Sequence, residues 1–138
     1  MTSGRLAGAI AVIALSVSGA SLAHHSFSAE FDAEKPITLT GIVTKVEWTN
    51  PHVWFYVNVK DEATGEVANW GAEMGPPHGL QRSGWRRDTL KIGEEVTVEG
   101  FLARNGSLRM NARTVTLTAT GARPGATLDA NSSSRSGN

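Results

Sequence analysis

The stretch that decides the fold is Glu47-Trp48-Thr49-Asn50-Pro51-His52-Val53-Trp54-Phe55-Tyr56-Val57-Asn58-Val59-Lys60. From His52 onward apolar and outward-facing residues alternate strictly, and the apolar set is Val53, Phe55, Val57 and Val59. Such alternation is typical of a β-strand with one face in a core. Asn50-Pro51 predicts a turn just before it, because proline fixes its own φ and disfavours the helical region for the residue it follows. We therefore expect one strand to end near Thr49 and the next to run over His52–Lys60.

The following segment predicts the partner of this strand. Residues 61–66 have the composition of a hairpin loop, and a third strand is expected over Val67–Met74. If the apolar faces coincide, Phe55 lies opposite Ala72 and Trp54 lies opposite Glu73. A slip by one residue would bury Glu73 in the core, which is costly. In this register His52 lies diagonal to Glu73, within reach across the strand pair.

The segment before the turn predicts a long first strand, Ile37–Trp48, whose alternation changes phase around Gly41. A glycine at a phase change suggests a bulge or sharp bend, which lets one strand serve two sides of a barrel. Residues 24–35 form a lead-in segment. Phe27 and Phe31 are four residues apart, so one helical turn would place both on one face, ready to dock on the barrel.

The second half of the chain predicts a helix and two more strands. Residues 75–79 break the sheet, and a short helix is expected over Leu80–Trp85. Strands follow over Glu95–Leu102 and Leu108–Thr118, joined by the hairpin signal Asn105-Gly106. From Ala119 onward the composition has no periodicity and too little apolar surface to order itself, so residues 119–138 are predicted to be a disordered tail.

The order of three strands, a short helix and two strands predicts an all-β domain over residues 36–118. We expect a small five-stranded Greek-key barrel resembling the oligonucleotide/oligosaccharide-binding (OB) fold, with its helix between strands three and four. The alternative is a small β-sandwich. The bend expected near Gly41 and the position of the helix favour the barrel.

The amino-acid composition limits the kinds of site and of partner that this chain can have. The chain has 138 residues, a formal net charge of +0 and no cysteine. Its length suits one domain. The absence of cysteine excludes disulfides, thiolate metal sites and cysteine nucleophiles. A neutral chain without a basic groove is not expected to bind nucleic acid.

The N-terminus predicts export. Arg5 precedes the apolar run of residues 6–17, and Ser21-Leu22-Ala23 fits a small-x-small cleavage pattern, as in a secretory signal peptide over residues 1–23. The alternative is an uncleaved N-terminal anchor. Cleavage after Ala23 would start the mature protein at His24, remove one basic residue and no acidic one, and leave a net charge of −1. We expect a periplasmic protein with no membrane span after cleavage.

Several short motifs together resemble an exported bacterial family known as domain-of-unknown-function family 6152. They are His24-His25-Ser26-Phe27, Phe31-Asp32, Leu39-Thr40-Gly41, Trp48-Thr49-Asn50-Pro51-His52, Gly84-Trp85 and Lys91-Ile92-Gly93. The resemblance covers roughly residues 24–118. It implies an exported bacterial protein with a small β-domain, and it implies no activity or catalytic residue.

The first candidate site is a metal site at the mature N-terminus. A terminal His24 can chelate a metal through its α-amine and Nδ1, which suits Cu(II). His52 or His78 could add an imidazole, His25 is a weaker candidate because it is adjacent in sequence, and Glu73 is a possible oxygen ligand or supporting group. Copper is favoured over nickel and zinc by the general affinity order. The alternative is that His24 and His25 are surface residues of a frayed terminus.

The second candidate is the outer face of strands two and three. Trp54 and Tyr56 could stack on a sugar, a base or a side chain of a partner. The alternative is that the lead-in segment covers them through Phe27 and Phe31.

The third candidate is a basic cluster made of Arg82, Arg86, Arg87 and Lys91, which could bind phosphate or an acidic partner. A solvated surface is the commoner outcome for such a run, and acidic residues lie beside it.

These observations predict an exported, non-enzymatic binding module, with a metal bound through the mature N-terminal histidine. The alternatives are a module that binds a protein or small ligand through its outer aromatic face, and an accessory subunit of an envelope complex. No residue is assigned a catalytic role, because no constellation of nucleophile, base and orienting group is recognisable.

Overall fold

The structure is a computed structural model that describes residues 27–118 and 125–131. The predicted signal peptide, His24 and His25 lie outside the described residues. After a helical turn at residues 27–30 the elements are β1 (Phe31–Glu47), β2 (Trp54–Lys60), β3 (Val67–Glu73), α2 (Pro77–Arg82), β4 (Glu95–Ala103), β5 (Arg109–Leu117) and β6 (Ala126–Asp129).

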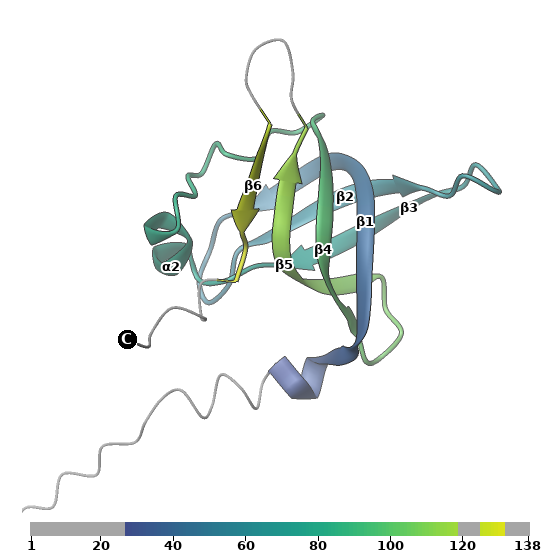
Figure 1. The fold of residues 1–138 in the computed structure, drawn as a ribbon, viewed down its shortest axis with the longest axis horizontal. Coiled ribbons are helices and arrows are strands. Elements are labelled where there is room, and N and C mark those ends of the chain that lie inside the picture. The colour runs from purple at the N-terminus through teal and green to yellow at the C-terminus, as the bar shows by residue number, and fades with distance from the viewer. Residues whose placement is uncertain (1–26, 119–124, 132–138) are drawn as a thin grey trace, which may run out of the picture.

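The described strands form one barrel-like sheet in the order β3-β2-β1-β4-β5-β6. A short parallel pairing of β3 with β5 joins the first five strands into a ring. In Figure 1, β2 and β3 cross behind β1, β4 and β5, and α2 lies to one side. The all-β prediction, with its helix between strands three and four, is confirmed. The described strands do not divide into the two sheets of the alternative sandwich.

The predicted register of β2 with β3 is confirmed. Trp54 pairs with Glu73, and Phe55 pairs with Ala72. The apolar face builds the core, where Phe55 and Val57 are fully buried. The opposite face carries Trp54 and Glu73 on the outside of the sheet, so the alternation of β2 determines which side chains are available to a site.

The bulge in β1 lies later than predicted. The register of β1 with β2 shifts between Val43 and Lys45, so Thr44 is the extra residue. Gly41 has a different role, because a Cβ at this position would lie 2.5 Å from the backbone oxygen of Asn58. The sequence therefore predicted the irregularity in the correct strand. Gly41, however, allows the backbones of two strands to approach closely, and the phase change occurs three residues further on.

The lead-in segment is tied to the barrel as predicted, and β1 begins earlier than expected because Phe31 pairs with Ala103 on β4. The Phe27 ring lies 5.9 Å from that of Phe31 and 6.0 Å from that of Phe101. Arg104 donates from Nε to the backbone oxygen of Ser28 at 2.7 Å, and its backbone N–H donates to Glu30. The lead-in turn therefore has a fixed place beside the β4–β5 hairpin.

The prediction of a disordered tail is wrong for residues 125–131. Residues 126–129 form β6 along β5. Beyond β6, Ala130 is fully buried, and its backbone N–H donates to the carbonyl of Arg113. The indole N–H of Trp85 donates to the carbonyl of Asp129 at 2.7 Å. The composition of residues 125–131 does not indicate a strand. The segment is stabilised by the free edge of β5 and by the buried Trp85, not by its own residues.

Among residues 27–118 and 125–131, no helix has the length and apolar character needed to cross a membrane.

Candidate functional site

The predicted contact between His52 and Glu73 is present. His52 Nδ1 lies 2.9 Å from Glu73 Oε1. Glu73 is the last residue of β3 and His52 precedes β2, so the hairpin register brings them together. Glu73 is only 8% exposed, whereas the His52 side chain is 40% exposed. The partly exposed imidazole of His52 therefore lies between solvent and the buried carboxylate of Glu73.

The environment of Glu73 disfavours its charge. Burial raises the pKa of the Glu73 carboxyl from 4.5 to about 7; the charge of nearby Glu30 adds to the rise, and Arg109 opposes it. Near neutral pH a large share of the Glu73 carboxyl is therefore protonated. A cation bound beside Glu73 would compensate the negative charge that burial disfavours.

Asn111 on β5 adjoins this pair and was not recognised from sequence. It is the register partner of Glu73 in the parallel pairing of β3 with β5, and it is 8% exposed. Its Oδ1 is buried and accepts no hydrogen bond from the described residues. The sequence places Asn111 on a strand, but only the pairing that closes the ring brings it beside Glu73.

The predicted aromatic face is present, with Trp54 and Tyr56 half-buried. The guanidinium of Arg109 lies 5.3 Å from the centre of the Trp54 ring, and Lys45 Nζ lies 5.4 Å from that of Tyr56. The Tyr56 hydroxyl donates to Glu47 Oε2 at 3.1 Å. These cations give each ring a partner within the chain, which leaves less ring surface for a stacked ligand than the sequence predicted.

The lead-in segment does not cover the aromatic face through Phe27 and Phe31, which was the alternative for that face. Phe27 packs on Phe101 and Phe31, not on the rings of the aromatic face. Glu30 nevertheless comes close enough to Glu73 to influence its pKa. The lead-in turn therefore belongs to the Glu73 end of the outer face.

The four predicted metal-ligating histidines divide into three groups. His52 lies in the site, His78 is exposed on α2, and His24 and His25 lie outside the described residues. Within residues 27–118 and 125–131, no three or more His, Asp or Glu side chains form a group that could hold a metal ion. His52 and Glu73 are two such donors, so any further donor must be of another type or come from another segment.

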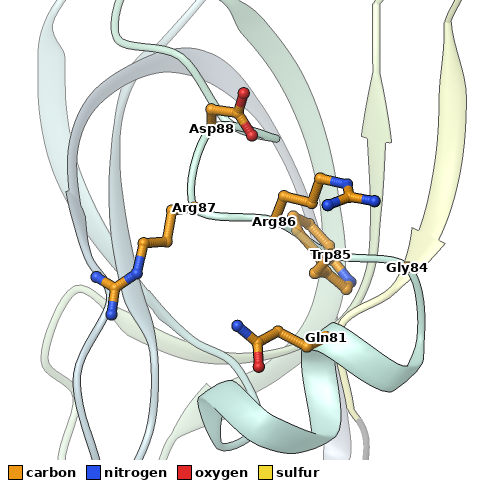
Figure 2. A pocket seen from close by; sticks show the side chains of 6 residues that line it. All are labelled: Gln81, Gly84, Trp85, Arg86, Arg87 and Asp88. Atoms are coloured by element: carbon orange, nitrogen blue, oxygen red, sulfur yellow. The ribbon is translucent and has the colours of Figure 1, made fainter.

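The basic cluster lies elsewhere. Arg86 and Arg87 line an open hollow of about 510 Å³ together with Gln81, Gly84, Trp85 and Asp88. Figure 2 shows the two arginine side chains pointing in different directions, with Asp88 above them and Gln81 below them. Guanidinium groups that diverge do not form a cradle for one anion. We place the candidate site at His52, Glu73 and Asn111, where the buried polar groups converge.

Comparison with known proteins adds one match. A family model described as "Family of unknown function (DUF6152)" matches residues 11–112, which include every strand up to the first part of β5. No curated protein matches the chain.

Proposed function

We propose that this chain, which belongs to the family of unknown function DUF6152, is an exported module that binds a transition-metal cation. His52 and Glu73 supply donors from the barrel. The mature N-terminus at His24 supplies its α-amine and imidazole, with His25 as a further imidazole. Export through a cleaved signal peptide places the module in the periplasm and creates the free amine that the site needs.

The observation that carries this proposal is the contact of His52 Nδ1 with a buried carboxylate, 2.9 Å from Glu73 Oε1. Burial raises the pKa of the Glu73 carboxyl, so a bound cation would stabilise a negative charge that this environment disfavours. Imidazole and carboxylate together suit Cu(II), Ni(II) or Zn(II), and copper leads by the general affinity order.

The lead-in turn brings the chain that carries the predicted N-terminal ligands toward this site. Phe27 and Glu30 are held on the barrel through Phe101 and Arg104, and the charge of Glu30 acts on Glu73. His24 lies three positions before Phe27 along the chain. An extended chain of three residues spans about 10 Å, which is enough to span the width of two neighbouring strands.

Replacing His52 by alanine is expected to weaken Cu(II) binding at least about tenfold, a loss seen even when a group that only supports a metal ligand is removed. The measurement is a calorimetric Cu(II) titration of the correctly processed protein. His78→Ala is the matched control, because this exposed histidine lies on α2 and outside the proposed site. Wild-type affinity in His52→Ala would remove His52 from the site, and an equal loss in His78→Ala would contradict the placement of His78 outside it.

The alternative is a module that binds a protein or small ligand through Trp54 and Tyr56; an accessory subunit of an envelope complex is a separate possibility. These rings lie side by side over Gly71, where an added Cβ would lie 3.3 Å from Tyr56 and 3.5 Å from Trp54. That reading predicts that Trp54→Ala abolishes binding of one defined partner while blocking the N-terminus has no effect. A metal site predicts the reverse.

A further inference from the structure

We infer that Asn111 is a third donor from the barrel to the proposed cation site, acting through its Oδ1. This inference rests on the proposed metal-binding function and specifies its ligand set. The barrel then contributes one nitrogen and two oxygens, from His52, Glu73 and Asn111. One of the three donors is a neutral amide, so the set is not made of histidine and carboxylate side chains alone.

The strand pairing places Asn111 on the correct face. Ala72 and Met110 are register partners and both are fully buried in the core. Side chains alternate along a strand, so their neighbours Glu73 and Asn111 both point to the outer face. Adjacent strands lie about 4.8 Å apart, which places the two side chains in contact range. His52 reaches the same carboxylate from the β2 side.

The missing hydrogen bond of Asn111 points to a ligand. A buried amide oxygen without a partner destabilises the folded protein, and nearly all such groups in proteins are satisfied. Asn111 is 8% exposed, and its Oδ1 has no partner within residues 27–118 and 125–131. A cation held between Asn111 and Glu73 would satisfy this oxygen and compensate the carboxylate at once.

The donor types define the class of cation. Imidazole nitrogen with carboxylate and amide oxygens suits divalent ions, whereas Cu(I) prefers sulfur ligands. The chain has no cysteine, and Met74 and Met110 are buried in the core. The site is therefore expected to hold Cu(II) and related divalent ions in preference to Cu(I).

The test compares Asn111→Leu, Asn111→Asp and wild type by Cu(II) titration and by thermal unfolding without metal. Asn111→Leu removes the unsatisfied oxygen, so we expect metal affinity to fall at least about tenfold while the metal-free melting temperature stays equal or rises by about 2–5 °C. Asn111→Asp keeps an oxygen and is expected to bind Cu(II) at least as tightly as wild type. Asn69→Leu, on the same face of β3, is the control and should keep wild-type affinity.

A ligand is distinguished from a residue that only supports the fold by the two effects of Asn111→Leu. Loss of a ligand lowers metal affinity but not the metal-free melting temperature, whereas loss of a supporting residue lowers both. Wild-type affinity in Asn111→Leu, or equal weakening in Asn111→Leu and Asn111→Asp, would overturn the inference. If Asn111→Leu does not fold, the comparison of Asn111→Asp with wild type decides. If wild type itself binds no metal, the proposed function fails; if wild type binds and Asn111→Leu binds equally, only the role of Asn111 fails.

Discussion

Alanine in place of Gly100 is expected to destabilise the domain by about 3 kcal/mol, the upper part of the usual range for overpacking a core. Gly100 is buried on β4, and a Cβ there would lie 1.9 Å from the backbone oxygen of Asn111. A side chain can rotate away from such a clash, but a backbone carbonyl within a strand pair cannot. For a domain of this size the melting temperature should fall by about 10–20 °C.

Gly71→Ala is the matched control for this prediction. Gly71 also lies in a strand, but its added Cβ would meet only the ring edges of Tyr56 and Trp54, at 3.3 Å or more. Those rings can shift by a few tenths of an ångström, so the control should change stability by less than about 1 kcal/mol. Similar melting temperatures for the two variants would contradict the close approach of β4 and β5 at Gly100.

The second large effect is a loss of stability with rising pH that depends on Glu73. The pKa of its carboxyl is about 7 in the folded protein, above the ordinary 4.5. Between these values the folded state holds a proton that the unfolded state has released, so stability falls as pH rises. The contribution is fully present below about pH 4.5 and is lost as pH rises through about 7. The difference between a pKa of 4.5 and one of about 7 corresponds to at most roughly 3.4 kcal/mol.

Urea unfolding of the metal-free protein at pH 5 and pH 8 measures this effect. Wild type should lose stability relative to Glu73→Gln over this interval, because glutamine carries no proton to release. Glu47→Gln is the control: hydrogen bonds from Lys45 and Tyr56 lower the pKa of the half-buried Glu47, so its titration lies below the interval. Parallel pH profiles for wild type and Glu73→Gln would show that burial does not hold a proton on Glu73.

The alternation within residues 47–60 was enough to predict the β2–β3 hairpin and the contact of His52 with Glu73. It succeeded because a one-residue slip would have buried Glu73 in the core. The position of the helix between strands three and four could also be read from sequence. These features depend on neighbours close along the chain.

The features that were missed depend on contacts between distant segments. Asn111 carries no sequence signal, since a lone asparagine in a strand has meaning only once β5 pairs with β3. Arg109 over Trp54 and Glu30 beside Glu73 follow from the same closure. β6 was missed because its order comes from pairing with β5 and from Trp85, not from its own composition.

The most direct test of metal binding through the mature N-terminus is a Cu(II) titration of two proteins. One begins at His24, and the other carries a single alanine before His24, which moves the α-amine away from the chelating imidazole. We predict tight binding of one equivalent by the first protein and its loss in the second. Equally weak binding by both would contradict the account, and attention would then turn to Trp54 and Tyr56.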